Sequence, residues 1–600
     1  MNSLQFTVNG KLKKVSIWEF FMNTRSGLFT FLLFLLLLAM ILLQVLSMVQ
    51  SDRLYERLNL LLETISSRQM PASKAEPNLR AQSAQKYPGD EGDWLVWALS
   101  GEIRTLNLLS VDADLDTRYI VSGNIIEPLF EQDLDADKEK LKPKLAEKMD
   151  ISEDGLEITI KLKDNIYFSD GVPVTADDII FTFETMMNPK IDCADLRNYF
   201  DNITGAVKLD NRRVKFVMKE RYWKTISMIG SFYVFPRHTY QFNDPNEFNK
   251  RISNPIGSGP YVFEKWDVGQ QIVLKRNENY WDKKPNIKKI VFKFISNATA
   301  ALQALRSHDT DIFEPGSEQV TDMPKDPQFS KEFRTIIFWD PSFGYWYIGW
   351  NEQRVFFKDR RVRQAMTCLT DRKAMVEQLT RGKGAVVTGT FYIYGRQNDP
   401  NIQPWPYDPQ KAAQLLDEAG WKDTDGDGIR DKDGIPFRFK YSYVAGNISA
   451  EQMARLLKDD AAKVGIEVIP NPTEWSIFIG NVNARDFDVV ELMWGGVIEE
   501  DPYQIFHSSQ IQGRGNNYVS FNNRQADELM ERARRELDEE KRYALYHQFH
   551  RILHEEQPYT FLMTRPRYYF IDKRFENVIV HKLGIDLFEW YVPKEKQRYK

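Results

Sequence analysis

Residues 423–434 form a segment of the sequence that resembles a metal-binding loop. In a calcium-binding loop, oxygen ligands recur at positions 1, 3, 5, 7 and 9, and a glycine allows a sharp turn at position 6. Gly428 falls at position 6, and the ligand positions are held by Asp423, Asp425, Asp427, the Ile429 carbonyl and Asp431. Position 12, where a bidentate glutamate is usual, is Gly434. We expect either a structural calcium site or a Gly/Asp-rich turn that binds no ion.

Three histidines in the segment 546–556 share one face of a predicted helix. His547, His550 and His554 stand at i, i+3 and i+7, a spacing at which neutral imidazoles can bind zinc or nickel. The alternative is an amphipathic helix in which the rings pack beside Tyr546 and Phe549. The HExxH pattern of zinc hydrolases is absent, so the packing interpretation is favoured.

Signatures of covalent catalysis are missing from the sequence. It has no GxSxG nucleophile elbow, no P-loop, and no GxGxxG motif that leads into a helix. Pairs of carboxylates carry no weight in a chain with 85 acidic residues. We therefore predict that the protein is not an enzyme and requires no cofactor.

The two cysteines give no sign of a disulfide scaffold or a zinc module. Cys368 lies within a predicted helix and is expected to be a small buried apolar side chain. A bridge between Cys193 and Cys368 is possible in an oxidising compartment but is not favoured.

Composition narrows the class of protein further. Of 600 residues, 42% are hydrophobic and 28% charged, which excludes a disordered or collagen-like chain, and the length predicts several lobes. The net charge of −5 offers no basic field, so no nucleic acid is expected as a partner. The aromatic content of 13% suits an aromatic-lined ligand cleft.

Residues 27–49 are uncharged over their whole length, which is enough for a helix to cross a bilayer. Four basic residues and one acidic residue precede them, so the positive-inside rule places residues 1–26 in the cytoplasm and the rest outside. A cleaved signal peptide is the alternative, but its apolar core would be shorter and would end at a small-x-small site. We expect an uncleaved membrane anchor, followed by a stalk helix and linker over residues 50–91.

From residue 93 onward, predicted strands and helices alternate, which indicates an α/β class. Apolar residues alternate with polar ones over 156–162, and Thr175 and Asp178 form the start of a helix. Later helices are predicted at Asp359–Gln378, Pro409–Ala419, Ser449–Val464, Gln525–Leu537 and Glu540–Glu556. Later strands are predicted at Ile272–Arg276, Ile290–Ile295, Phe437–Tyr443, Gly465–Pro470 and Asp488–Trp494.

Several motifs of the sequence, and the order in which they occur, resemble those of the family 5 extracellular solute-binding proteins. This family includes the peptide-binding receptors of ABC importers. The signature-like region is Leu145–Glu184, with the motif SDGVPVTADD near its centre. The motifs that follow in the family's order are Asn254–Tyr261, Arg276–Trp281, Lys358–Met366, Thr370–Arg372, Leu415–Trp421 and Asp486–Gly496. The resemblance spans about Trp94 to Asp586.

The resemblance implies a two-lobed α/β fold like the type II periplasmic binding proteins, with an extra subdomain, preceded by one transmembrane helix. The first lobe would comprise residues 92–127, 251–342 and 565–600, the subdomain 128–250, and the second lobe 343–564. The chain would cross between the lobes near Ile337–Tyr345 and Tyr559–Tyr568, where a few residues absorb the closing rotation.

The function implied is that of a membrane-anchored extracytoplasmic receptor of an ABC importer. It would be a monomer that captures a peptide or peptide-like solute by lobe closure and delivers it to permease subunits in the cytoplasmic membrane. A membrane-tethered sensor or scaffold that uses the same lobes is the alternative, although Met1–Ser26 is too short for a signalling domain.

The resemblance also implies a ligand site. In peptide-binding members, a strand that ends in Trp-x-x-Asp pairs with the ligand backbone, and its aspartate binds the ligand's ammonium. Here Val497 holds the aspartate position. A nearby acid could replace that aspartate, the ligand could lack a free amino terminus, or the acids could be solvated, with Asp501 capping a helix at Pro502. The ligand-binding residues expected are Leu115, Asp116, Met493, Trp494, Gly495, Glu499, Glu500 and Asp501.

Overall fold

The computed structural model describes residues 3–8, 11–16, 89–250, 254–513 and 515–599. The chain divides into two compact units, residues 1–82 and 83–600. In the first unit, strands β1 (Ser3–Val8) and β2 (Lys11–Ser16) form an antiparallel hairpin. The predicted membrane span 27–49 and the stalk lie outside the described residues. None of the helices within the described ranges is long and apolar enough to cross a membrane.

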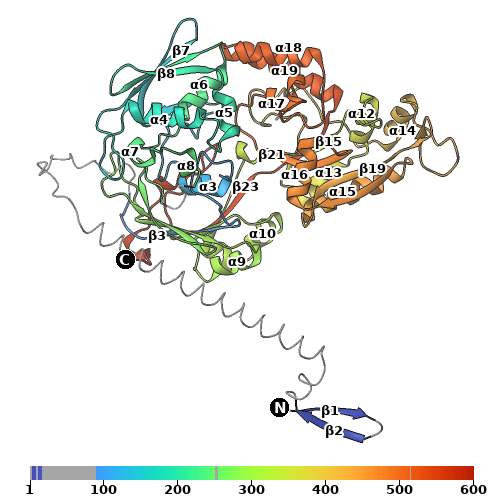
Figure 1. The fold of residues 1–600 in the computed structure, drawn as a ribbon, viewed down its shortest axis with the longest axis horizontal. Coiled ribbons are helices and arrows are strands. Elements are labelled where there is room, and N and C mark those ends of the chain that lie inside the picture. Colours follow the sequence, from blue (N-terminus) through green and yellow to red (C-terminus); the bar gives the residue numbers. More distant parts are fainter. Residues whose placement is uncertain (1–2, 9–10, 17–88, 251–253, 514, 600) are drawn as a thin grey trace, which may run out of the picture. The chain divides into compact units, whose positions relative to one another are not determined.

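The first lobe of the second unit, in which Figure 1 labels strands β3 and β23, is built on a seven-stranded sheet with the order β10-β11-β12-β3-β13-β23-β14. Its strands are β3 (Trp94–Leu99), β10 (Tyr261–Asp267), β11 (Gln271–Arg276), β12 (Lys289–Phe294), β13 (Ile312–Phe313), β14 (Phe333–Phe338) and β23 (Arg567–Asp572). The central strand β3 is parallel to both neighbours and buried on both faces, which explains its continuous apolar sequence. The helices of this lobe are α3 (Leu115–Val121), α9 (Ala298–Arg306), α10 (Ser317–Asp322) and α11 (Pro327–Glu332), with short 3-10 turns η1 (Met323–Lys325), η4 (Leu587–Glu589) and η5 (Lys594–Lys596).

A subdomain with its own four-stranded antiparallel sheet interrupts the first lobe. The sheet has the order β6-β7-β9-β8, with β6 (Ala146–Ile151), β7 (Glu157–Leu162), β8 (Ile203–Lys208) and β9 (Arg213–Met218). The other elements are β4 (Phe130–Gln132), β5 (Leu141–Pro143), α4 (Ala176–Met187), α5 (Ala194–Phe200), α6 (Trp223–Gly230), α7 (Arg237–Tyr240) and α8 (Pro245–Lys250). Helix α4 begins as predicted, because the Thr175 amide donates to the Asp178 carboxylate at 2.8 Å. One continuous hydrophobic core joins this subdomain to the first lobe.

The second lobe contains a six-stranded sheet with the order β16-β22-β15-β21-β19-β20. Its strands are β15 (Tyr345–Trp350), β16 (Ala385–Val386), β19 (Arg438–Val444), β20 (Glu467–Thr473), β21 (Val489–Trp494) and β22 (Tyr559–Thr564), and a small hairpin is formed by β17 (Asp431–Lys432) and β18 (Ile435–Pro436). The helices are α12 (Arg360–Cys368), α13 (Arg372–Thr380), α14 (Pro409–Glu418), α15 (Ile448–Ala462), α16 (Trp475–Ala484), α17 (Tyr503–Phe506), α18 (Arg524–Arg535) and α19 (Glu539–Glu556), with the 3-10 turn η3 (Ser508–Gln510). Ile348 and Val489 face one core cluster while Tyr347 and Val490 face another, so the sheet is covered on both sides.

The single helix predicted over 359–378 is wrong. Two helices, α12 and α13, occupy this stretch and are separated by residues 369–371. The Asp371 carboxylate accepts a hydrogen bond from the Ala374 amide at 2.9 Å and so starts a second helix.

The chain passes between the two sheets twice. It leaves β14 and enters β15 through residues 339–344, which include the 3-10 turn η2 (Pro341–Phe343), and it returns from β22 to β23 through Arg565 and Pro566. Gly344 is required at the first crossing, because its φ is +70° and a Cβ there would lie 1.8 Å from the Trp494 carbonyl oxygen.

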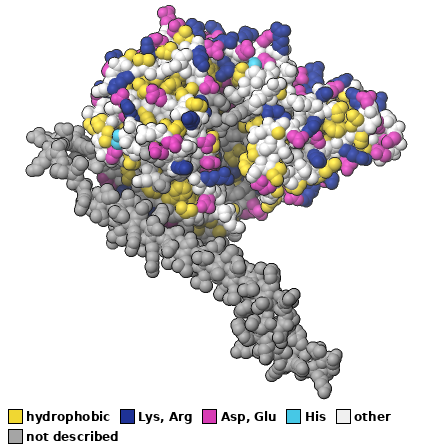
Figure 2. All heavy atoms as spheres, in the orientation of Figure 1, with side chains coloured by type: hydrophobic (Ala, Val, Ile, Leu, Met, Phe, Trp, Pro, Cys, Tyr) yellow, Lys and Arg dark blue, Asp and Glu magenta, His cyan; other side chains and the backbone are white. Residues whose placement is uncertain are grey.

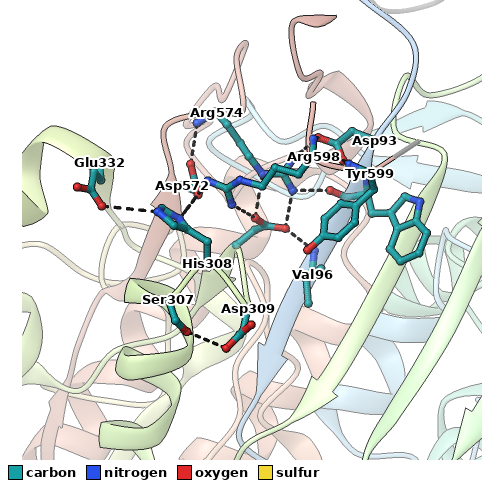
Figure 3. A network of polar contacts seen from close by, with 12 residues as sticks. Asp93, Val96, Ser307, His308, Asp309, Glu332, Asp572, Arg574, Arg598 and Tyr599 are labelled. Atoms are coloured by element: carbon teal, nitrogen blue, oxygen red, sulfur yellow. Dashed lines mark hydrogen bonds and ion pairs between the residues drawn. The ribbon is translucent and has the colours of Figure 1, made fainter. Parts of the chain in front are cut away.

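A buried charge network ties the start of β3 to the end of the chain (Figure 3). The Arg574 guanidinium pairs with Asp93 and, at 2.7 Å, with Asp311. Arg598 pairs with Asp572 at 2.6 Å and with Asp311 at 3.4 Å. Removing one partner would leave a buried charge unpaired, which is energetically costly. The network therefore holds the C-terminal segment against the first lobe.

Candidate functional site

Three adjoining cavities run along the first lobe, and we name each by one lining residue. The Asp116 cavity (about 70 Å³) and the Leu115 cavity (about 360 Å³) share Trp97, Tyr119 and Tyr569 as lining residues. The Leu115 cavity and the Val497 cavity (about 420 Å³) share Asp340 and Phe588, among others. The Val497 cavity alone is lined by both lobes and the subdomain, because it includes Gly496, Val497 and Ile498 from the loop after β21. Together these cavities form the candidate binding cleft.

Helix α3 places the two predicted residues of the first lobe in this cleft. Its first turn is capped by Asp114, whose carboxylate accepts a hydrogen bond from the Thr117 amide at 2.7 Å. Leu115 is 43% exposed and lines the Leu115 cavity, while Asp116 is half-buried and lines the Asp116 cavity. Burial, and then the nearby Asp114, raise the pKa of Asp116 to about 6.

The predicted residues of β21 are placed differently. The Trp494 ring is stacked nearly parallel to those of Tyr347 and Tyr518, at 6.2 and 5.8 Å, within the second lobe. Met493 is 38% exposed, and neither it nor Trp494 or Gly495 lines any of the three cavities. The next three residues line the Val497 cavity instead, so the loop after the strand brings the second lobe to the cleft.

Glu499 is buried in contacts with its own chain. Its carboxylate accepts a hydrogen bond from the Tyr543 hydroxyl at 2.6 Å and pairs with Arg542 at 3.4 Å. The Glu139 amide of the subdomain also donates to it, at 3.3 Å. The Lys224 ammonium, again from the subdomain, donates to the Glu499 carbonyl at 3.0 Å. Glu499 therefore joins the subdomain to α19 rather than facing solvent.

Asp501 is buried in a second contact of the same kind. Its carboxylate accepts a hydrogen bond from the Tyr222 hydroxyl of the subdomain and pairs with Arg534 of α18 at 3.2 Å. The Arg534 guanidinium lies over the ring of Tyr222, at 4.2 Å from its centroid. Helices α6 and α18 contact each other beside these residues (Figure 1). The suggestion that the three acids are solvated loop residues is therefore wrong for Glu499 and Asp501.

Glu500 is the remaining acid of the three. Its backbone pairs with the Gln397 side chain in both directions, at 2.6 and 2.8 Å. Burial raises the pKa of Glu500 to about 7, while Lys224 opposes the rise. Within the described residues, the Glu500 carboxylate has no ion pair within 4.0 Å, in contrast to its two neighbours.

An arginine pair that the sequence analysis missed lies at the second crossing. Arg567 is almost fully buried and pairs at 2.7 Å with both Glu314 of the first lobe and Asp340 of the first crossing. Arg565 pairs with Glu314 at 3.1 Å. Although burial opposes it, Glu314 raises the pKa of Arg567, so this side chain stays charged. The sequence signal was the Arg-Pro-Arg triplet between two apolar strands.

The loop 423–431 brings acidic groups together on the surface of the second lobe. Carboxylate oxygens of Asp423, Asp425 and Asp431 lie within 4.8 Å of one another. Asp423 also accepts hydrogen bonds from the amides of Gly426 and Gly428, at 2.7 and 3.0 Å. The remaining aspartate of the predicted set, Asp427, accepts a hydrogen bond from the Ile429 amide at 2.7 Å and is not part of this group. This arrangement suits a turn held by its own amides and also leaves three carboxylates close enough to share a cation.

The three histidines of α19 do not converge. The His550 ring nitrogens are engaged by the Asp399 amide and the Thr388 hydroxyl, both at 3.2 Å, and burial lowers the pKa of His550 to about 4. His547 contacts the Arg396 carbonyl at 2.9 Å. These rings pack into the lobe, and the metal interpretation has no support in the part of the chain that the structure describes. Both cysteines are buried free thiols.

The charges on the visible face of the molecule are mixed. Figure 2 shows lysine and arginine side chains interspersed with aspartate and glutamate over both lobes. Such a face has no extended basic patch of the kind that binds a nucleic acid backbone.

Comparisons with known proteins agree with this architecture. Residues 140–517 match the family model of bacterial extracellular solute-binding proteins, family 5 Middle. The oligopeptide-binding protein AppA of Bacillus subtilis (strain 168) is 34% identical over 512 residues, which cover 82% of this chain and 89% of that protein. The nickel-binding periplasmic protein of Escherichia coli (strain K12) is 27% identical and covers 72% of this chain and 82% of its own.

Solved structures give the same result. AppA from Bacillus subtilis in complex with a nonapeptide has a TM-score of 0.72 and 31% identity, over 84% of this chain and all of that one. NikZ from Campylobacter jejuni in complex with Ni(L-His) has a TM-score of 0.70 and 26% identity, over 83% and 99%. The two-lobed α/β fold is thereby confirmed. The relatives are solute-binding proteins rather than enzymes, which confirms the prediction that this chain is not an enzyme.

Proposed function

The chain belongs to the bacterial extracellular solute-binding proteins of family 5, and from this premise we propose that it captures a peptide or peptide-like solute for an ABC importer. The observation that carries the proposal is the cleft between two lobes joined by two short crossings. The three cavities follow one another along this cleft and end at the loop 496–498 of the second lobe. A ligand that contacts both lobes stabilises the closed form, which is the form that a permease can recognise.

Peptides are the favoured cargo because the relative with 34% identity and a solved neighbour are named for oligopeptides. The cleft is lined by a mixture of aromatic rings and charged groups, among them Tyr233, Phe588, Lys144 and Asp340. Such a lining holds an extended chain with varied side chains. Nickel chelates and haem are alternatives that other relatives suggest by their names.

The test is to identify what the protein carries. The full-length chain is purified in detergent from its own host and unfolded, and the released small molecules are analysed by mass spectrometry. Short peptides are expected in about one copy per chain. Purified protein that releases no peptide and binds none from a random peptide pool by calorimetry would refute the proposal.

The proposed location is the cytoplasmic membrane, with residues 27–49 as an uncleaved anchor and the second unit outside. The support is the uncharged run and the basic residues before it. Deleting residues 27–49 behind a cleavable secretion signal is expected to release the protein from membranes, whereas the intact chain stays in the membrane fraction after a high-salt wash. An intact chain that is found in the soluble fraction would refute the anchor.

The loop 423–431 is proposed to hold a structural calcium ion. Its support is the loop spacing together with the three carboxylates within 4.8 Å. The ion would brace the turn between α14 and β19 and would take no part in ligand capture.

A further inference from the structure

The Asp116 cavity is small, and several aromatic side chains line it. Four aromatic side chains line it: Trp97 from β3, Tyr119 from α3, Phe313 from β13 and Tyr569 from β23. The Trp97 ring lies 5.5 Å from that of Tyr119 and 5.6 Å, edge to face, from that of Tyr569. Trp97 and Tyr569 are at most 5% exposed, so these two walls are fixed by the first lobe. Aromatic faces attract cations, and more strongly where water is excluded.

Two carboxylates, Asp116 and Glu314, also line the cavity, together with small and apolar residues. Glu314 is already neutralised by Arg565 and Arg567. The Asp116 carboxylate has a single hydrogen bond, from the Gly101 amide at 3.2 Å, and no ion pair within 4.0 Å among the described residues. The cavity therefore holds one carboxylate that lacks a cationic partner.

The size of the cavity selects the group that fits. The volume open to the centres of water molecules is about 70 Å³. A single water needs a cavity of at least about 10–15 Å³, so this cavity admits a group of a few heavy atoms. The end of a lysine side chain, a short methylene chain with one ammonium, is a group of this size.

The cavity is also placed where a ligand's side chain can enter it. Trp97, Tyr119 and Tyr569 also line the Leu115 cavity, so the two cavities adjoin and a ligand that lies along the cleft passes beside the Asp116 cavity. We propose that the Asp116 cavity is a subsite for an alkylammonium group of the ligand, such as a lysine side chain, which pairs with Asp116 beside the rings of Trp97, Tyr119 and Tyr569. This inference rests on the proposed function, because a captured ligand must supply the ammonium.

The experiment compares peptides that differ in one charge. Calorimetry on the full-length protein in detergent measures binding of tetrapeptides in which each position in turn carries lysine, its uncharged isostere norleucine, or acetyl-lysine. At one position, lysine is expected to bind about 10- to 100-fold more tightly than norleucine, the range for a buried charge-assisted contact. Acetyl-lysine, which is longer and uncharged, is expected to bind at least as weakly as norleucine.

Two variants locate the effect. Asp116→Asn is expected to lose the preference for lysine and to bind the norleucine peptide within about twofold of wild type, which also shows that it is folded. Asp114→Asn is the matched control: it removes a neighbouring negative charge, keeps a good helix cap, and is expected to retain the preference.

Several outcomes would overturn the inference. Equal binding of lysine and norleucine peptides at every position by wild type refutes the subsite while leaving peptide capture intact. A preference that survives in Asp116→Asn refutes the role of Asp116. Failure of every peptide to bind overturns the proposed function. In that case 1,5-diaminopentane decides the subsite: binding that Asp116→Asn abolishes supports an alkylammonium subsite, and absence of binding overturns it.

Discussion

Removing one hydroxyl between the subdomain and the second lobe is expected to weaken ligand binding without touching the ligand. Tyr222 belongs to the subdomain, its ring packs in a core cluster of the second lobe, and its hydroxyl donates to Asp501 of that lobe. If the lobes open by rotation about the two crossings, we expect this contact to break, so that it would favour the closed form. The substitution Tyr222→Phe deletes the hydroxyl and keeps the ring against Arg534.

The magnitude follows from the burial of the pair. Tyr222 and Asp501 are 4% exposed each, and a hydrogen bond to a charged group contributes about 1.5–3 kcal/mol. Because Asp501 keeps Arg534 as a partner at 3.2 Å, we expect a loss of about 2 kcal/mol, the lower part of that range. This corresponds to about a 30-fold shift from the closed towards the open form. The Kd rises by up to the same factor, and most of the change appears as faster dissociation.

Two measurements check this expectation. Calorimetry and stopped-flow dissociation give the affinity and the rate, using the ligand that co-purifies with the protein. Distances between spin labels at Val207→Cys and Ile448→Cys, both exposed, report the opening, since the two native thiols are buried. Tyr503→Phe is the matched control: its hydroxyl contacts Ser509 within the second lobe, so binding is expected to be unchanged. If Tyr222→Phe binds and releases ligand as wild type does, the contact is not specific to the closed form and the reasoning fails.

Three further predictions concern stability. Burial raises the pKa of Glu491 to about 8, so the native state keeps a proton that the unfolded state loses above pH 4.5. The free energy of unfolding therefore falls by up to about 5 kcal/mol as pH rises from 4.5 to 8. Denaturant titrations should show that Glu491→Gln abolishes this part of the fall, and an identical pH profile would refute the shift. Gly344→Ala should lower the free energy of unfolding by about 3 kcal/mol in the same assay, because its Cβ clashes with the Trp494 carbonyl. The control is Gly123→Ala, where φ is +72° but the space is open, and its loss should be about 1 kcal/mol. Equal losses in the two variants would contradict the clash. In protein freed of metal with a chelator, calcium at about a hundred times its Kd should raise the free energy of unfolding by about 2.7 kcal/mol. Asp423→Asn should abolish this rise, whereas the control Asp433→Asn should keep it. No rise in the wild-type protein would refute the site.

Local patterns predicted much of the fold. The alternation over 156–162 and the Thr175 cap gave strand β7 and helix α4 at their observed places, because both depend on neighbours in sequence. The break at Asp371 was missed, since the apolar spacing of 359–378 continues through it and the cap outweighs propensity there.

The site was less accessible to such reasoning. Glu499 and Asp501 were expected to face a ligand, but their partners Tyr222 and Lys224 are more than 270 positions away and are brought near by the fold alone. Trp494 was placed in the cleft by its motif, whereas its ring stacks within the second lobe because Tyr347 and Tyr518 offer parallel faces. The residues around Trp494 in the sequence do not indicate that its ring stacks on Tyr347 and Tyr518.

The strand order of the seven-stranded sheet governs when each lobe can fold during synthesis. Strand β14 pairs with β23 and with no other strand of that sheet, and β23 also covers the free edge of β13. Residues 567–572 leave the ribosome after the whole six-stranded sheet, whose last strand ends at Thr564. The second lobe can therefore complete its sheet first, although it begins later in the chain, while the first lobe waits with an unpaired β14 edge. Exposed edges of this kind favour aggregation, so the interval between the synthesis of β14 and that of β23 is the stage at which we expect the nascent first lobe to be most prone to it.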